Sequence, residues 1–313
     1  MNYKPIILVA GEPKSIFFEI FFKSIKKNNF KSPLIIIGSL KLLKSEMKKF
    51  KFKKKIKILL SDSLNDYGLN NQTINLIDVN FNPKKKNDYI NNCFDIAFKI
   101  IKTKFSNKFI NGPINKSNFL KKKFLGITEY ISNKFQTKET AMLIYNKHLS
   151  VSPLTTHLPL KTVSKKINQK LIKKKAKIIN DFYIKHIGFK PKIALTGLNP
   201  HCETIDKYNE DQKITAPAIK SLKKKGYRIN GPFPADTIFL KQNRKKYNVI
   251  IGMYHDQVLS PFKALNEYDA INITLGLPFF RISPDHGPNQ KMVNKNLSNP
   301  LSLIESIKFL EKR

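Results

Sequence analysis

Residues 5–27 read PIILVAGEPKSIFFEIFFKSIKK. The short apolar run Ile6–Ala10 has the length and composition of a strand that is buried on both faces. The turn Gly11-Glu12-Pro13 follows it, and Ser15–Lys27 then carries apolar residues at helical spacing. A strand, a turn and a helix in this order predict one unit of an α/β fold.

The same alternation continues along the chain. Further strands are predicted at Leu34–Ile37, Ile56–Leu60, Ile74–Val79, Phe109–Asn111, Ile193–Gly197, Val249–Met253 and Ile271–Leu275. Further helices are predicted at Tyr89–Lys104, Val163–Ile187, Ala216–Lys225 and Leu301–Glu311. Because no linker rich in Gly, Ser or Pro divides the 313 residues, we expect two α/β lobes joined by crossing segments. Residues 1–125 plus 285–313 are predicted to form the first lobe, and residues 126–284 the second.

The charge of the chain is strongly positive. Lysine and arginine number 58 against 22 Asp and Glu, which gives a formal net charge of +36 and makes nucleic acid the first partner to consider. Only four of these cations are arginine, although specific recognition of bases and phosphates relies on its bidentate guanidinium. The lysine runs also lack interleaved aromatic residues. We therefore interpret them as solvated faces and predict no specific nucleic-acid partner.

Other sequence features favour a cytoplasmic enzyme without a membrane segment. No apolar run approaches the ~20 residues that cross a bilayer, and the N-terminal run is too short for a secretory signal. The two cysteines, Cys93 and Cys202, form neither a disulfide framework nor a Cys-x-x-Cys zinc pair. There is also no glycine fingerprint for a dinucleotide and no Walker loop.

Three of the six histidines share one context. His157, His201 and His255 each follow an apolar run that reads as a strand. The carboxyl ends of strands in an open α/β sheet border the crevice in which ligands bind. Imidazole is a common ligand of divalent metals, and three protein ligands with one open position are typical of a catalytic site. A single histidine at a strand end is more often structural, but three in one context favour a metal site.

A second group of polar residues follows His255. It contains Asp256, Lys263, Asn272 and Arg281, and Arg281 is one of only four arginines. Two cations and an amide near a metal suit a substrate that carries a carboxylate or a phosphate. Asp256, or alternatively Asp236, could relay a proton or orient a ligand histidine, and a structural role is an equal alternative for each.

Several longer motifs resemble one family along nearly the whole chain. They are Gly11-Glu-Pro, Gly112-Pro-x-x-Lys116, Gly126-x-Thr-Glu-Tyr130, Thr155-Thr-His-Leu-Pro-Leu160, Gly197-Leu-Asn-Pro-His201, Asn230-Gly-Pro-x-Pro-Ala-Asp-Thr237, Met253-Tyr-His-Asp-Gln257, Asn272-Ile-Thr-Leu-Gly-Leu-Pro-Phe279 and Asp285-His-Gly287. In this order they resemble the 4-hydroxythreonine-4-phosphate dehydrogenases of vitamin B6 biosynthesis.

The resemblance implies a two-lobed α/β/α fold of the isocitrate/isopropylmalate dehydrogenase type. It also implies a homodimer whose active site is shared between subunits, with the metal ligands and the dimer interface in the second lobe. His157 and His201 of one subunit and His255 of the other would hold a divalent metal, Zn, Mg or Co. Thr128, Lys263, Asn272 and Arg281 match the family's substrate-binding positions.

The reaction implied is the NAD- or NADP-linked oxidation of 4-phosphooxy-L-threonine, a small phosphorylated hydroxy-amino-acid. Decarboxylation to 3-amino-2-oxopropyl phosphate follows. The chain departs from the family at Ile127, where the family has a substrate-binding histidine, and at Pro288–Met292. A related phosphorylated hydroxy-acid, such as a phosphoerythronate, is therefore an alternative substrate. A basic nucleic-acid-binding protein that has lost catalysis is a third reading, against which the intact histidine trio speaks.

Overall fold

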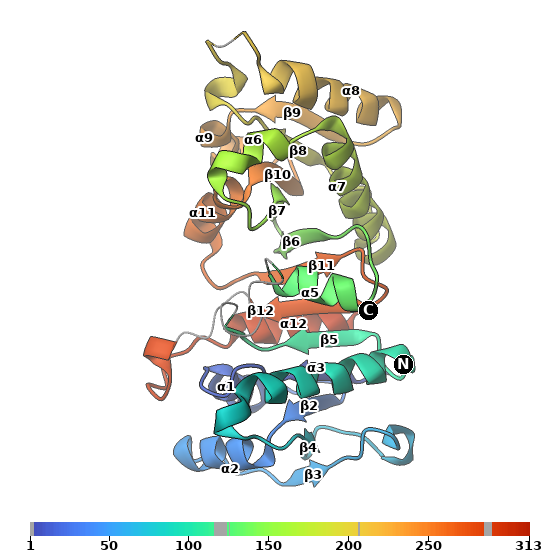
Figure 1. The fold of residues 1–313 in the computed structure, drawn as a ribbon, viewed down its shortest axis with the longest axis vertical. Helices are drawn as coiled ribbons and strands as arrows, with labels where there is room; N and C mark the ends of the chain where they lie inside the picture. The colour runs from blue at the N-terminus through green and yellow to red at the C-terminus, as the bar shows by residue number, and fades with distance from the viewer. Residues whose placement is uncertain (1–2, 116–123, 125, 206, 285–289) are drawn as a thin grey trace. The chain divides into compact units, whose positions relative to one another are not determined.

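The structure is a computed structural model that describes residues 3–115, 124, 126–205, 207–284 and 290–313. The chain divides into two compact units (Figure 1). The first contains Met1–Phe124 and Pro278–Arg313, and the second contains Leu125–Leu277. The return to the first unit thus lies at Pro278 rather than at the expected residue 285, because the strand that follows Pro278 pairs within the first unit.

The first unit is built on a parallel sheet with the strand order β3-β4-β2-β1-β5-β12. Its strands are β1 (Ile6–Val9), β2 (Leu34–Gly38), β3 (Ile56–Ile58), β4 (Ile74–Asp78), β5 (Lys108–Asn111) and β12 (Phe280–Pro284). Every residue of β1, β2 and β5 is buried, which explains the continuous apolar runs of β1 and of Leu34–Ile37 in β2.

Amphipathic helices cover this sheet. They are α1 (Phe17–Lys27), α2 (Leu40–Lys49), α3 (Lys86–Lys102) and α12 (Leu301–Glu311). The helix α3 packs on β1 and β2, while α12 contacts both β12 and α1 (Figure 1). The buried side of α1 is unusually aromatic, and the rings of Phe18 and Phe22 stack with centroids 6.1 Å apart.

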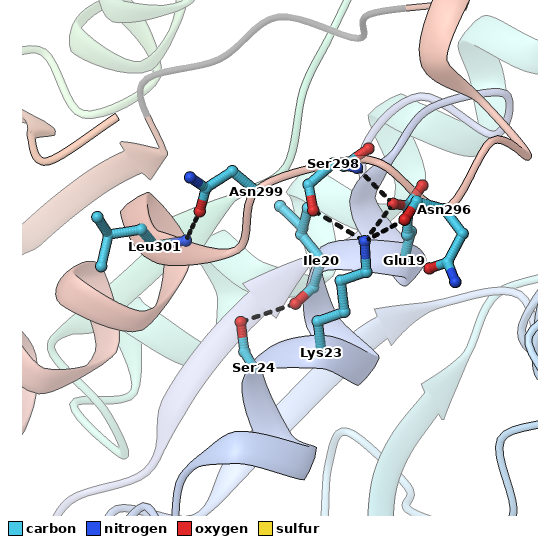
Figure 2. Close-up of polar contacts among 8 residues, drawn as sticks. All are labelled: Glu19, Ile20, Lys23, Ser24, Asn296, Ser298, Asn299 and Leu301. Carbon is cyan, nitrogen blue, oxygen red and sulfur yellow. Dashed lines mark hydrogen bonds and ion pairs between the residues drawn. The ribbon is translucent and has the colours of Figure 1, made fainter. Parts of the chain in front are cut away.

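A buried carboxylate ties α1 to the segment before α12 (Figure 2). The side chain of Glu19 accepts hydrogen bonds from the Ser298 amide at 2.7 Å and from the Lys23 ammonium at 2.8 Å. The same ammonium donates to the carbonyl oxygens of Asn296 and Ser298 at 2.8 and 3.0 Å. Glu19 is only 3% exposed, so these bonds to Oε1 offset part of the cost of burying its charge, while Oε2 has no hydrogen-bond partner among the described residues.

The second unit has a mixed sheet with the strand order β11-β6-β7-β10-β8-β9. The strands are β6 (Ala141–Tyr145), β7 (Ser150–Thr155), β8 (Ile193–Thr196), β9 (Ile229–Phe233), β10 (Val249–Tyr254) and β11 (Ile271–Leu275). From β7 to β9 the neighbouring strands are parallel, whereas β6 pairs antiparallel with both β7 and β11.

The helices of the second unit are α5 (Ile127–Lys134), α6 (Val163–Lys166), α7 (Gln169–Phe182), α8 (Ala216–Lys224), α9 (Ala235–Ile238), α10 (Lys241–Arg244) and α11 (His255–Asn266). The helix α11 contacts β7 and β10, and α7 contacts β6, β7 and β11. Gly226 closes α8 with a positive φ of 78°, the C′ position at which glycine is favoured. In the described ranges no helix is both long and apolar enough to span a membrane.

The mixture of mostly parallel strands with flanking helices confirms the predicted α/β class. In the second unit the parallel strands β7, β10 and β8 are neighbours, so their carboxyl ends leave the sheet at one edge. This edge is where an α/β fold usually binds its ligands.

Candidate active site

The three histidines predicted as metal ligands follow the three neighbouring strands β7, β10 and β8. Thr155 at the end of β7 is in register with Tyr254 at the end of β10, and Leu195 of β8 is in register with Ile251 of β10. His157 lies two residues beyond β7, and His255 directly follows β10 as the first residue of α11. The predicted positions at the carboxyl ends of strands are therefore confirmed.

The rings of His157 and His255 lie beside one another in the same chain. Their centroids are 6.2 Å apart and their planes are tilted by 35°. Two imidazoles that share a tetrahedral ion through bonds of about 2.1 Å have centroids roughly 5 Å apart. A relative movement of about 1 Å would bring this pair to that geometry. The donor chemistry of the two side chains suits a divalent ion, but their rings lie about 1 Å farther apart than a shared ion requires.

Each of these two imidazoles has a carboxylate next to its Nδ1 atom. The Asp256 Oδ1 atom is 2.6 Å from Nδ1 of His255, and the Glu129 Oε1 atom is 3.8 Å from Nδ1 of His157. A carboxylate at Nδ1 favours a proton on that nitrogen and leaves Nε2 free to bind a metal. Asp256 is therefore placed to orient the His255 imidazole, and its role in the site stays a prediction.

Glu129 is a site residue to which the sequence assigned no role. Burial raises the pKa of its carboxyl group, but the His157 imidazole and the Thr156 hydroxyl outweigh this, so the pKa lies below its usual value. The Thr156 hydroxyl donates to Glu129 Oε1 at 3.3 Å. Glu129 is the third residue of α5, so its charge also lies favourably at the N-terminus of the helix.

His201 lies on a loop that a buried carboxylate holds in shape. Asp211 is 1% exposed and accepts hydrogen bonds from the backbone amides of Leu198 and Asn199 at 2.8 and 2.9 Å. Beyond this anchor His201 and Cys202 adopt left-handed backbone conformations, with φ of 54° and 62°. Asp211 is a second residue missed by the sequence reasoning, because its distance from His201 along the chain hides its contact with the loop.

Gln257 links the histidine loops. Its Oε1 atom accepts from the Thr196 hydroxyl at 2.8 Å and from the Met253 amide at 2.7 Å, and its Nε2 atom donates to the Gly197 carbonyl at 2.8 Å. One amide side chain thus joins the start of α11, which carries His255, to the end of β8, which precedes the His201 loop.

Only two of the three predicted ligand histidines lie close together. His157 and His255 are neighbours, whereas His201 is exposed on its own loop. Within one chain, the described residues contain no group of three or more His, Cys, Asp or Glu side chains arranged to hold a metal ion.

Three predicted substrate-binding residues lie in the second unit. The hydroxyls of Thr128 in α5 and Thr274 in β11 are 3.4 Å apart, and Asn272 lies on the same face of β11 as Thr274. The Oδ1 atom of Asn272 is buried without a hydrogen-bond partner among the described residues. In native proteins such an acceptor is usually satisfied by an ordered water or by a ligand. Lys263 lies in α11, the helix that begins at His255, and is half-buried.

Arg281 belongs to the first unit, where it lies in β12 and is 0% exposed. Its Nε atom donates to Oδ1 of Asn111, the last residue of β5, at 2.8 Å. The side chain is therefore built into the structure rather than solvated. Asp236, the alternative residue predicted for proton relay, is exposed in the first turn of α9. Its negative charge helps to raise the pKa of the Cys202 thiol.

In the first unit, the turn at Gly11-Glu12 packs against the turn at Gly112-Pro113. Gly11 has a φ of 76°, and a Cβ atom there would lie 2.5 Å from the Pro113 carbonyl oxygen. The Glu12 amide donates to that oxygen at 2.9 Å, and the buried Glu12 carboxylate pairs with Lys86. The motif residues Lys116, Asp285–Gly287 and Pro288 lie outside the described residues.

Comparison with known proteins gives a consistent result. A family profile described as "Pyridoxal phosphate biosynthetic protein PdxA" matches residues 29–310. A 4-hydroxythreonine-4-phosphate dehydrogenase of Sulfurihydrogenibium sp. is 36% identical over 97% of this chain and 96% of its own length. The crystal structure of the enzyme of the same name from Klebsiella pneumoniae superposes with a TM-score of 0.83, at 28% identity and 99% coverage of both chains.

More distant structures share the fold alone. A terephthalate 1,2-cis-dihydrodiol dehydrogenase from Burkholderia xenovorans superposes with a TM-score of 0.63 at 17% identity, covering 99% of this chain and 98% of its own. The profile match and the full-length relative identify the family, whereas similarity of fold alone does not. This chain belongs to the PdxA family, whose relatives named here are 4-hydroxythreonine-4-phosphate dehydrogenases.

Proposed function

We propose that this protein oxidises 4-phosphooxy-L-threonine with NAD or NADP and then decarboxylates the product to 3-amino-2-oxopropyl phosphate, in the biosynthesis of pyridoxal 5′-phosphate. The observation that carries the proposal is the His157–His255 pair, each with a carboxylate at Nδ1, in a chain of the PdxA family. The names of the relatives supply the substrate.

His157, His201 and His255 would hold the divalent metal, Zn, Mg or Co. Bound there, the ion would act as a Lewis acid toward the oxygen of the substrate's secondary alcohol. A homodimer with a shared site is part of the proposal. As the family resemblance implies, the proposed ligands are His157 and His201 of one subunit and His255 of the other. The neighbouring rings of His157 and His255 in one chain support both as members of the site.

The remaining residues would bind and orient the substrate. Lys263 and Arg281 supply cations for its phosphate and carboxylate, and the guanidinium of Arg281 suits bidentate contacts. The unsatisfied Oδ1 atom of Asn272 and the hydroxyl of Thr128 suit its ammonium and hydroxyl groups. A bound NAD or NADP would accept a hydride from the carbon that bears the secondary alcohol, and the hydroxyl proton would pass to a base. The resulting β-keto acid would lose CO2, and its α-carbon would then be protonated.

Reduction of NAD or NADP, followed at 340 nm with 4-phosphooxy-L-threonine, tests this function. We expect turnover that is lost in excess chelator and restored by added divalent ion. The variant His157→Ala should lower kcat/KM at least about 100-fold, because it removes a metal ligand. His148→Ala is the matched control, because His148 is an exposed histidine outside the proposed site. Equal turnover with and without chelator would refute the metal's role.

A phosphorylated hydroxy-acid such as a phosphoerythronate is the second candidate substrate. The observation that favours it is Ile127, the first residue of α5 and the neighbour of Thr128, where the family has a histidine. An apolar side chain there offers no polar contact to the substrate. A larger kcat/KM for the erythronate than for 4-phosphooxy-L-threonine would decide for this alternative.

A further inference from the structure

The carboxylate of Glu129 and the ring of His157 meet above a glycine. A Cβ atom at Gly126 would lie 2.7 Å from Cε1 and 2.8 Å from Nδ1 of His157, and 2.8 Å from Oε2 of Glu129. A Cβ atom there would force one of the two side chains to shift, so glycine leaves room for both groups where they lie. The Nδ1–Cε1 edge of the ring and one carboxylate oxygen therefore both lie close to the position that a Cβ atom would take at Gly126.

The surroundings of Glu129 favour its ionised form. The Thr156 hydroxyl donates to Oε1, and the position in the first turn of α5 adds the favourable helix dipole. The charge of Glu129 also attracts the half-buried ammonium of Lys175 in α7. The second carboxylate oxygen, Oε2, has no hydrogen-bond partner among the described residues. The oxygen that lies beside Nδ1 of His157 is Oε1, and a carboxylate oxygen can accept a second hydrogen bond besides that from Thr156.

We propose that Glu129 is a positioning residue that accepts a hydrogen bond from Nδ1–H of His157 and so keeps the lone pair of Nε2 available for the divalent ion. The separation of 3.8 Å is too long for a hydrogen bond, and the two groups must approach by about 1 Å to form one. The proposal rests on the proposed function, because it assumes that His157 is a metal ligand. Gly126 has the complementary role of leaving space for the contact.

The variants Glu129→Ala and Glu129→Gln test this role, with Glu139→Gln as the matched control. Glu139 pairs with Lys174 in the same unit, and its side chain is 45% exposed. Co2+ is the probe, and its dissociation constant is measured by calorimetry and by visible absorption. We expect Glu129→Ala to weaken Co2+ binding about 10- to 100-fold, as is usual when a carboxylate behind a ligand histidine is removed. Glu129→Gln should fall between this variant and the wild type, and Glu139→Gln should match the wild type.

A second measurement does not depend on the metal. In metal-free protein labelled with 15N-histidine, the ring nitrogens of His157 report its tautomer, and His157→Ala identifies its signals. We expect the Nδ1–H tautomer in the wild type and a shift toward Nε2–H in Glu129→Ala. An unchanged tautomer together with a Co2+ dissociation constant within about twofold of the wild type would overturn the proposal.

The two measurements also separate failure of the positioning role from failure of the proposed function. If His157→Ala binds Co2+ as tightly as the wild type, the metal site is wrong, and the tautomer still decides whether Glu129 positions the ring. If Glu129→Ala does not fold, the same two measurements on Glu129→Gln decide, since the amide retains the shape and loses the charge.

Discussion

Cys202 follows His201 directly and shares its left-handed backbone conformation. Its sulfur fills the space above Gly197, where a Cβ atom would lie only 2.6 Å away. Burial raises the pKa of the thiol to about 11, and the Asp211 carboxylate contributes in the same direction. The residue beside a proposed metal ligand is therefore a neutral, packed thiol rather than a reactive thiolate.

The reactivity of Cys202 should reflect this pKa. At pH 8 a thiol with a pKa of about 11 has about a hundredfold less thiolate than one at the usual 9.0. We expect iodoacetamide to alkylate Cys202 about a hundredfold more slowly in the folded protein than in urea, measured by mass spectrometry in a Cys93→Ala background. The rate should rise about tenfold per pH unit and level off only above about pH 11.

Asp211→Asn is the informative variant for this experiment. It removes the nearby negative charge, so the thiol pKa should fall and alkylation at pH 8 should become severalfold faster. A folded-state rate equal to that in urea would contradict the burial of the thiol.

At the scale of secondary structure elements, the junction of α1 with the segment before α12 depends on the buried Glu19 carboxylate (Figure 2). Glu19→Ala leaves the Ser298 amide and the Lys23 ammonium without this acceptor. We expect it to lower the free energy of unfolding by about 1–3 kcal/mol. Urea unfolding followed by circular dichroism at 222 nm measures the change.

The control for Glu19 is Glu305→Ala in α12. Glu305 pairs with Lys308 at 3.1 Å, and its side chain is 38% exposed. Such a surface pair should contribute less than about 1 kcal/mol. Equal losses in the two variants would mean that the junction does not stabilise the first unit.

The secondary structure elements that were predicted correctly are those with an uninterrupted apolar pattern. β1, β2 and β8 are short runs buried on both faces, and α12 carries apolar residues along most of its length. The predicted helix Val163–Ile187 is instead broken, because Asn168 caps a new helix through its hydrogen bond to the Leu171 amide. β9 was missed because its sequence INGPF contains Gly and Pro, and α11 because Pro261 lies inside it.

The candidate site was predictable to the extent that it depends on local sequence. His157 and His255 could be identified because strand ends are visible along the chain. The distance between them could not be predicted, because it depends on the pairing of β7 with β10 across about a hundred residues. The supporting carboxylates of Glu129 and Asp211 were missed for the same reason. Glu129 contacts His157, which is distant in sequence, and Asp211 binds the backbone amides of the His201 loop. A sequence motif does not reveal contacts of either kind.

At the scale of the whole molecule, mixing inactive variants tests how a dimer would divide its metal ligands. In the proposed dimer, His157 and His201 of one chain and His255 of its twin hold the ion. Co-expressed His157→Ala and His255→Ala chains would then form mixed dimers with one intact site out of two. Random pairing predicts recovery of about a quarter of wild-type kcat. His157→Ala mixed with His201→Ala should recover nothing, because each site would lack one ligand. The reverse pattern would mean that His157 and His255, whose rings are neighbours in one chain, act together and that the twin supplies His201.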